Sequence, residues 1–233
     1  MPRANVFVTG GTGYIGRRLI PALVTDGNVV SALVRAESQR RLPPSATPVI
    51  GNVLARETFV TKIPRDAVVV HLVGTPRPSP AKAAQFEAID FVSARECIAA
   101  AADAGARHFV YVSVAHPAPI MHAYVDVRVR GEALLRASGL PYTILRPWYV
   151  LGPGHRWPYL LVPAYAIMRA IPSTRDGARR LGLVTLGRML AALRWSVDTA
   201  GAESRTLDVT AIRRIGRGPS LDATRPTHEK TTA

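Results

Sequence analysis

The chain has 233 residues, which is enough for one large domain with a substantial core. Hydrophobic residues make up 48% of it and charged residues 20%, which excludes a disordered or fibrous protein. The net charge of +14 would by itself point to a phosphate-rich partner, but the arginines are scattered and no helix-turn-helix, aromatic RNA platform or zinc spacing accompanies them. A solvated basic surface is therefore a better interpretation than nucleic-acid binding.

The cysteine content and the start of the chain bear on its location. Cys97 is the only cysteine, so neither an intramolecular disulfide nor a cysteine-rich metal site can form, and no metal site is expected. A few strand-like residues lead into a glycine-rich loop, which leaves no room for a signal peptide, and no later window reaches the length of a membrane span. A cytoplasmic protein is expected, and its oligomeric state is not predicted.

Strand and helix patterns alternate along the N-terminal part of the chain. Apolar, β-branched runs typical of buried strands lie at 6–9, 29–34, 67–73, 109–114 and 142–145. Apolar residues at helical spacing lie between them, at Ile15, Leu19 and Leu23, at Phe86, Ile89, Val92 and 97–102, and at Val125, Val129, Ala133 and Leu134. The first helix is retained although Pro21 removes one of its hydrogen bonds. The alternation predicts an α/β fold with a Rossmann-type, doubly wound parallel sheet and helices on both faces.

The composition changes after Pro147. Residues 148–182 are rich in proline, aromatic and aliphatic side chains with interrupted periodicity, and we interpret them as a small substrate cap. Two alternatives stay open: a core-packing excursion and, because Arg156 and Arg169 flank the apolar run, a surface that touches a membrane peripherally. From Arg213 onward few apolar residues remain, so 213–233 is predicted to be a disordered tail and 1–212 a single domain.

Gly10, Gly13 and Gly16 form a G-x-x-G-x-x-G pattern between the first strand and the first helix. In such a turn the first glycine permits a sharp exit from the strand, the second lets the backbone approach a pyrophosphate, and the third allows close packing of the helix on the sheet. The phosphates would lie at the helix N-terminus, where unpaired N–H groups favour negative charge. Because a second strand pattern follows at the spacing of a βαβ unit, the loop predicts dinucleotide binding.

The end of the second strand pattern indicates which dinucleotide binds. NAD-binding proteins place Asp or Glu there to hold the ribose 2′-hydroxyl, whereas this chain has Arg35, a fixed cation suited to a 2′-phosphate. Glu37 would serve NAD if the strand ended later, and Arg17 and Arg18 either add positive charge near the phosphate or point to solvent. NADP(H) is expected in preference to NAD(H).

Several segments together resemble the atypical, NmrA-like branch of the short-chain dehydrogenase/reductase superfamily: TGGTGYIGRRL, ALVR, GNVL, VVHLVG and GEALLRASGLPYTILRPWYVLGPG. The resemblance covers residues 4–155 well and continues weakly to about residue 212. It implies a pyrophosphate loop made by Gly10, Thr12, Gly13, Tyr14, Ile15 and Gly16.

The same resemblance implies contacts along the rest of the cofactor. Arg35 would face the adenosine ribose phosphate. Asn52, beside Val53, stands where relatives usually have an Asp that contacts the adenine amine, and its carbonyl can accept the same bond. The remaining expected contacts are Leu72, Val73 and Gly74 beneath the adenine side and Pro147 and Trp148 near the nicotinamide end.

Reductases of this superfamily use a Tyr-x-x-x-Lys pair and a serine or threonine after an earlier strand. Here the pair is Tyr124 and Arg128, so arginine replaces lysine. A cation four residues away on one helix face would lower the pKa of the tyrosine from about 10, but an arginine fork does not place its donors where an ammonium would. Ser113 is the candidate serine, although Ala115 stands at the counterpart position in the motif. Tyr124, Arg128 and Ser113 are the candidate catalytic residues of an altered triad.

Other polar residues have simpler interpretations. His116 and His122 are polar loop residues, with a general-acid role as the alternative. His71 is interpreted as a strand residue whose ring is satisfied by hydrogen bonds, and Glu132 and Arg136 as a surface ion pair on a helix.

Two functions are compatible with these patterns. The first is an NAD(P)H-dependent oxidoreductase that transfers hydride to a small, fairly apolar substrate under the cap. The second is a non-catalytic NADP(H)-binding protein, a redox sensor or an assembly or regulatory factor, which the altered triad favours. Fold and cofactor do not name the substrate.

Overall fold

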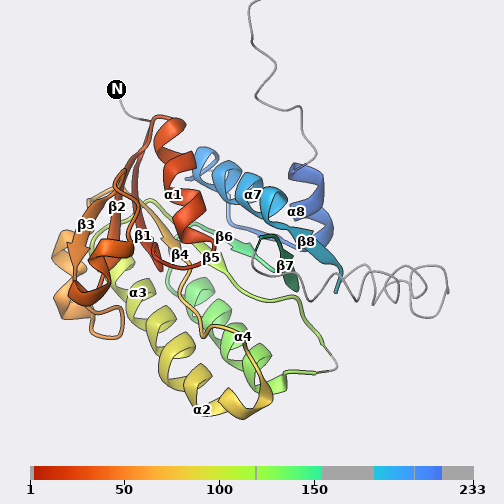
Figure 1. Ribbon diagram of the computed structural model, residues 1–233. Helices are drawn as coiled ribbons and strands as arrows, with labels where there is room; N and C mark the ends of the chain where they lie inside the picture. The colour runs from red at the N-terminus through yellow and green to blue at the C-terminus, as the bar shows by residue number, and fades with distance from the viewer. Residues whose placement is uncertain (1–2, 119, 154–180, 202, 217–233) are drawn as a thin grey trace, which may run out of the picture.

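The computed structural model describes residues 3–118, 120–153, 181–201 and 203–216 (Figure 1). The predicted cap at 148–182 lies mostly outside these ranges, as does the part of the predicted tail beyond residue 216. Among the helices in the described ranges, none has the length and apolar character needed to cross a membrane.

A seven-stranded parallel sheet with the order β3-β2-β1-β4-β5-β6-β9 forms the centre of the fold. Its strands are β1 (Asn5–Thr9), β2 (Val29–Val34), β3 (Thr47–Ile50), β4 (Val68–His71), β5 (His108–Val112), β6 (Tyr142–Leu145) and β9 (Arg205–Leu207). Two further strands, β7 (Tyr149–Leu151) and β8 (Leu183–Thr185), pair in parallel as a small separate sheet. The strand order reverses between β1 and β4, which is where ligands bind in doubly wound sheets.

Helices cover both faces of the large sheet, as predicted (Figure 1). One face carries α1 (Gly16–Thr25), α7 (Leu186–Asp198) and α8 (Val209–Ile215), and the other carries α3 (Val92–Asp103) and α4 (His122–Ala137). A short α2 (Ala83–Gln85) and a π-helical turn (Phe86–Phe91) lead into α3. Short 3-10 helices lie at Ala36–Arg41, Arg56–Thr58, Val60–Lys62 and Pro80–Lys82.

The core has two layers because successive residues of a strand point to opposite faces of the sheet. Val6 and Val8 of β1 pack with Leu19 of α1 on one face. Phe7 points to the other face, where its ring stacks on that of Phe59 with centroids 6.3 Å apart. With both faces covered, the central strands are apolar without alternation, which is why the sequence pattern reveals them. Pro21 lies inside α1 without ending it, as expected.

The buried face of α4 differs from the one that the apolar spacing predicted. The helix is present, but Val129 is 36% exposed, and the buried residues are Val127, Arg128, Gly131, Glu132 and Leu135. Two ionised side chains therefore point toward the sheet. They are stabilised there by partners from distant parts of the chain, which a single-helix pattern does not contain.

Two edge strands and the end of α8 also differ from the sequence analysis. Strands β3 and β9, at the two edges of the large sheet, were not predicted because neither shows a continuous apolar run: β3 is mostly exposed and contains Pro48, and β9 has three residues of which one is buried. Helix α8 continues to Ile215, so the tail predicted from Arg213 begins inside a helix.

Candidate cofactor and catalytic site

A cleft of about 520 Å³ lies beside the carboxyl ends of β1 and β4, at the point where the strand order reverses. The structure brings many of the predicted cofactor residues together in its wall. They are Gly10, Thr12, Gly13, Arg35, Asn52, Val53, Leu72, Val73 and Gly74. Residues that are far apart in the sequence thus line one continuous surface, as the Rossmann-type fold requires.

The glycine loop is tight enough to need its glycines. Gly10 has φ +78°, and a Cβ there would lie 2.9 Å from the carbonyl carbon of Leu72. A Cβ on Gly16 would lie 2.7 Å from the Cα of Gly11. The Gly13 N–H donates to the Gly10 carbonyl over 3.0 Å, which closes the turn. The loop therefore fits a phosphate group that approaches the backbone closely.

Helix α1 supports the same conclusion. It begins at Gly16 and has no acidic side chain in its first turn, so the positive end of its dipole is left for an external anion. Tyr14 and Ile15 precede the helix and are not among the described residues that line the cleft. Ile15 packs against the core, and the Arg18 guanidinium lies 4.6 Å from the centroid of the Tyr14 ring. Through these contacts Tyr14 and Ile15 hold the end of the glycine loop against helix α1 and the core.

Two arginines, Arg35 and Arg41, line the cleft beyond the end of β2. The Arg35 side chain is 65% exposed and forms an ion pair with Glu37, Nε to Oε1 at 3.1 Å. Ser38 and Arg41 also line the cleft, and the Arg41 Nη2 donates to the Ser38 Oγ over 2.7 Å. The sequence analysis missed these two residues. They reach the cleft because the 3-10 helix Ala36–Arg41 follows β2 directly.

Asn52 lines the same cleft, and both its side chain and its backbone make local hydrogen bonds. The Asn52 Oδ1 accepts a hydrogen bond from the Leu54 backbone N–H over 3.1 Å, and the Asn52 backbone N–H donates to the Thr58 Oγ1 over 2.9 Å. An amide oxygen has two lone pairs, so a second donor can still bind there. The local turn fixes the direction in which that oxygen points.

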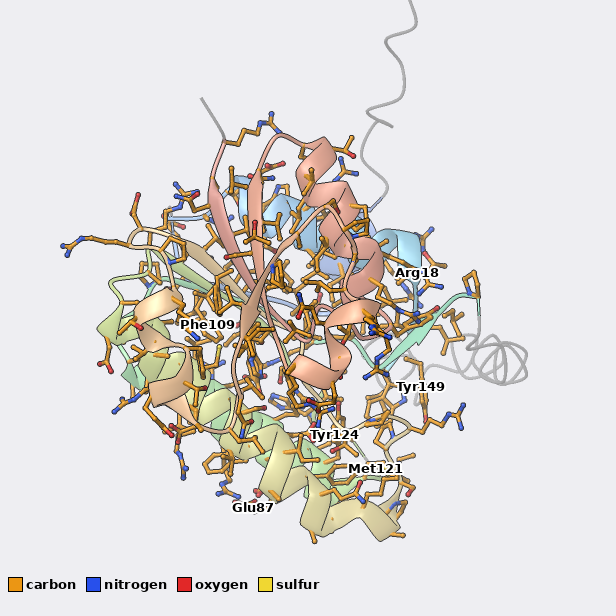
Figure 2. All side chains as sticks on the ribbon, turned by 60° about the vertical axis from the view of Figure 1, so that its left-hand side comes forward. Arg18, Glu87, Phe109, Met121, Tyr124 and Tyr149 are labelled. Carbon is orange, nitrogen blue, oxygen red and sulfur yellow. The ribbon has the colours of Figure 1, made fainter. Side chains whose placement is uncertain are left out.

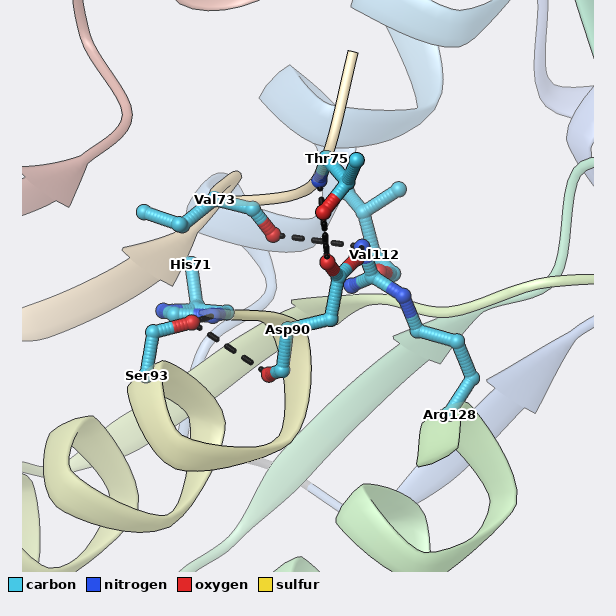
Figure 3. Close-up of polar contacts among 7 residues, drawn as sticks. All are labelled: His71, Val73, Thr75, Asp90, Ser93, Val112 and Arg128. Atoms are coloured by element: carbon cyan, nitrogen blue, oxygen red, sulfur yellow. Dashed lines mark hydrogen bonds and ion pairs between the residues drawn. The ribbon is translucent and has the colours of Figure 1, made fainter. Parts of the chain in front are cut away.

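A buried ion pair lies against the cleft-lining residues Val73 and Gly74 (Figure 3). The Arg128 Nη2 lies 2.5 Å from Asp90 Oδ1, and the exposed fractions of the two side chains are 4% and 0%. The same carboxylate accepts two bonds from Thr75, from the backbone N–H at 3.0 Å and from the hydroxyl at 2.6 Å. Asp90 belongs to the π-helical turn that precedes α3. All charges of this pair are therefore compensated inside the protein.

The rest of the Arg128 guanidinium ties two strands together. Its Nη1 donates to the Val112 carbonyl over 3.0 Å, and its Nη2 reaches the Val73 carbonyl at 3.3 Å (Figure 3). Val112 ends β5, and Val73 follows β4 in the cleft wall. A Cβ on Gly74 would collide with the Arg128 Nη2, so Gly74 leaves room for the guanidinium. Arg128 thus fixes the backbone that borders the cleft.

Tyr124 and Arg128 lie together on α4, as their spacing predicted. The Arg128 Cζ is 5.2 Å from the centroid of the Tyr124 ring, and the Phe86 ring packs edge-on against Tyr124 with centroids 5.1 Å apart. The Arg128 guanidinium thus lies over the face of the Tyr124 ring, and Phe86 packs against the ring edge-on, so the ring is held between these two side chains.

Ser113 has a different neighbour. Its hydroxyl donates to the Glu132 Oε1 over 2.7 Å, and Glu132 also accepts bonds from Arg136 and Arg146. The ion pair predicted between Glu132 and Arg136 is present, but Glu132 is fully buried, so its placement at the surface was wrong. Burial alone would raise the pKa of Glu132, but hydrogen bonds from Arg146 and Ser113 hold it below its usual value. His116 Nε2 lies 3.5 Å from the same carboxylate.

His71 is held inside the sheet, as expected. Its Nδ1 lies 2.8 Å from the Thr9 hydroxyl, and its Nε2 lies 3.5 Å from the Ser93 hydroxyl. Burial, with a contribution from the nearby Arg128, lowers its pKa to about 3. The ring is therefore neutral at physiological pH.

Pro147 and Trp148 follow β6. The Pro147 carbonyl accepts the Ala115 N–H over 2.9 Å, and the Trp148 ring packs against Tyr149 with centroids 5.5 Å apart. Neither is among the described residues that line the cleft. His122 is the exposed first residue of α4.

The parallel sheet and the glycine-lined cleft at its switch point define a dinucleotide-binding protein of the Rossmann type. A family model described as NAD(P)H-binding matches residues 10–157, and the chain belongs to this family. The chain thus binds NAD(P)H, as the glycine spacing predicted.

Similar proteins include two reductases and an assembly factor. A 4-hydroxy-2-methyl-3-oxo-4-farnesyl-3,4-dihydroquinoline-1-oxide ketoreductase of Stigmatella aurantiaca is 32% identical over 64% of this chain and 51% of its own length. A ceramide reductase of Caulobacter vibrioides is 29% identical over 65% of this chain and 48% of its own length. The photosystem II assembly factor Ycf39 of Guillardia theta is 31% identical over 60% of this chain and 44% of its own length. The chain thus spans about half the length of these relatives or less.

A solved structure supports the fold. The NAD complex of the Bordetella bronchiseptica enzyme WbmG is similar with a TM-score of 0.65 and 20% identity, over 87% of this chain and 71% of the other.

Proposed function

We propose that the protein is an NADPH-dependent reductase that acts on a small, fairly apolar carbonyl or alkene substrate. The observation that carries the proposal is the position of α4: Tyr124 lies on this helix beside Arg128, whose guanidinium binds the Val73 carbonyl in the wall of the cofactor cleft. A candidate proton donor is thus linked to the dinucleotide site by one side chain. The two reductases among the relatives agree with this assignment.

NADPH is the cofactor that the charges in the cleft favour. Arg35 and Arg41 both line it, and among the described lining residues there is no Asp or Glu to hold a ribose 2′-hydroxyl. The Glu37 carboxylate is paired with Arg35 instead. Two fixed cations and the Ser38 hydroxyl offer charge-assisted bonds to a 2′-phosphate.

Each candidate residue has a separate role in the proposed reaction. When bound, NADPH supplies the hydride that reduces the substrate, and it is thereby oxidised to NADP⁺. In carbonyl reduction, the Tyr124 hydroxyl donates a proton to the carbonyl oxygen, an alcohol forms, and Tyr124 takes a proton back from solvent. Arg128 packs over the Tyr124 ring, which orients the hydroxyl, and it positions the cleft wall through the Val73 carbonyl. Pro147 and Trp148 are proposed to border the nicotinamide end.

The test combines binding with turnover. Fluorescence titrations with NADPH and NADH measure affinity, and loss of NADPH absorbance across a panel of carbonyl compounds measures reduction. Tyr124→Phe is expected to abolish turnover while the Kd for NADPH stays nearly unchanged. Tyr142→Phe, at the opposite end of the sheet at the start of β6, is the matched control and should keep both properties. Turnover that persists in Tyr124→Phe would contradict the proposed role.

A second function is favoured by one observation. The Ser113 hydroxyl is bound to Glu132, so the serine expected to assist the tyrosine is occupied inside the protein. The alternative is a non-catalytic NADP(H)-binding protein in which the cofactor orders a surface for a partner, and an assembly factor is among the relatives. Tight NADPH binding without consumption of any carbonyl compound, in the wild type, would support this alternative.

A further inference from the structure

A second cleft, of about 440 Å³, lies at the start of α4. Residues in its wall include Pro80, Phe86, Ile120, Met121, His122 and Tyr124. Met121 and Tyr124 lie beside each other at this end of the molecule (Figure 2). The volume is in the range of sites that bind small organic ligands.

This wall is apolar and carries no fixed charge. Among its described lining residues there is no Lys, Arg, Asp or Glu, and the polar side chains are those of His122 and Tyr124. Ile120 is 53% exposed, so its apolar surface is accessible to a ligand in the cleft. A phosphate placed here would lose its water without gaining a cation, whereas the first cleft offers Arg35 and Arg41. The two clefts therefore suit ligands of different chemistry.

Met121 has an unusual backbone conformation for its residue type. Its φ is 62° and its ψ is 37°, the left-handed region that favours glycine and asparagine. An unbranched thioether side chain at this position adapts its shape to apolar ligands. The left-handed backbone of Met121 is unfavourable in free energy, and it occurs where the side chain forms part of the cleft wall.

Tyr124 connects this second cleft to the cofactor cleft. Its ring contacts Phe86 of the second cleft on one side and Arg128 on another. Phe86 begins the π-helical turn whose Ile89 lines the cofactor cleft, and Arg128 binds the Val73 carbonyl there. A substrate whose carbonyl oxygen reaches the Tyr124 hydroxyl would extend its remaining atoms into the apolar cleft.

We infer that this second cleft binds the hydrocarbon chain of the substrate, so that the proposed reductase acts on carbonyl compounds with an alkyl tail and not on sugar nucleotides. The inference rests on the proposed function only in so far as the substrate carries a carbonyl group that the protein reduces. The binding of the chain follows from the apolar wall and is measurable without turnover. Each additional buried methylene is worth roughly a fourfold increase in kcat/KM.

The experiment uses straight-chain aldehydes from butanal to decanal with NADPH and the full chain. For the wild type, kcat/KM is expected to rise roughly fourfold per methylene until the cleft is filled. Met121→Asn keeps a residue that tolerates the left-handed backbone but removes the apolar surface, and Ile120→Asn changes an exposed position. Both are expected to flatten the dependence on chain length. Val129→Asn, an exposed aliphatic side chain on α4 outside the cleft, is the control and keeps the wild-type slope.

A binding measurement separates this inference from the proposed function. An uncharged probe, N-decyl dansylamide, is titrated in the presence and absence of NADPH, and its Kd is expected to rise roughly tenfold in Met121→Asn and Ile120→Asn but not in Val129→Asn. If the probe binds in this way and no aldehyde is reduced, the reductase proposal fails and the chain-binding cleft stands. If the probe does not bind the wild type, or if both variants keep the wild-type slope, the inference is overturned.

Discussion

Removal of the Arg128 guanidinium should destabilise the protein far more than removal of a typical surface arginine. In Arg128→Met the Asp90 carboxylate stays buried with only the two bonds from Thr75. Breaking a buried ion pair at one partner costs about 3 to 5 kcal/mol. The carbonyls of Val73 and Val112 each lose a donor as well, for about 1 kcal/mol apiece.

Urea unfolding followed by far-UV circular dichroism measures this loss in the free energy of unfolding. The control is Arg130→Met on the same helix, since Arg130 pairs with Glu87 at the surface and its removal should change stability little. The double variant Asp90→Asn/Arg128→Met should be less destabilised than the sum of the single variants, by at least about 1 kcal/mol, because no buried charge remains. Additive effects, or a loss below about 1 kcal/mol in Arg128→Met, would refute the reasoning.

Three further predictions concern the cofactor, the glycine loop and pH. Arg35→Asp should weaken NADPH binding at least about tenfold and shift the cofactor preference toward NADH, because repulsion replaces one charge-assisted bond. An NADPH affinity equal to that of the wild type in fluorescence titrations would show that Arg35 points elsewhere. Gly10→Ala should lower both the melting temperature and NADPH affinity, since a Cβ there meets the Leu72 backbone; a variant that matches the wild type would contradict the close approach. Burial holds the pKa of His71 at about 3 and that of His108 at about 4, so below the usual value of 6.5 the unfolded chain binds protons that the folded chain excludes. The contribution of the two histidines to the free energy of unfolding should be complete above pH 6.5. It should decrease as the pH is lowered from 6.5 to 4, by up to about 1.4 kcal/mol per pH unit for each histidine. Urea unfolding at several pH values would show no such slope if the rings are accessible.

The central strands and the glycine loop were predictable because their signals are local. Val6 and Phe7 belong to an uninterrupted apolar run that only a doubly covered strand requires, and Gly10, Gly13 and Gly16 mark one turn by spacing alone. Both signals are complete within a few residues of sequence. The parallel direction of the strands and the helices on both faces then follow from the alternation of strands and helices.

The parts that were missed depend on distant partners. Arg128 was predicted as a catalytic partner of Tyr124 and Glu132 as a surface residue, yet both are buried, and their partners Asp90 and Arg146 come from other elements. Arg41 reaches the cofactor cleft only because a 3-10 helix follows β2. Edge strands such as β3 bury too little surface to show an apolar pattern. Pairings of this kind are set by tertiary structure, which a single sequence does not display.

The two buried charges on α4 restrict how this helix can rotate and slide. Apolar packing tolerates small shifts, because one methyl group replaces another at similar energy. Arg128 and Glu132 have opposite signs and are four residues apart, and each binds different partners on neighbouring elements. A rotation by one residue would separate both charges from their partners simultaneously, so a single orientation is strongly preferred. Tyr124, on the same helix, thereby has a defined direction, and an α4 redesigned with an apolar buried face would lose that orientation even if it gained stability.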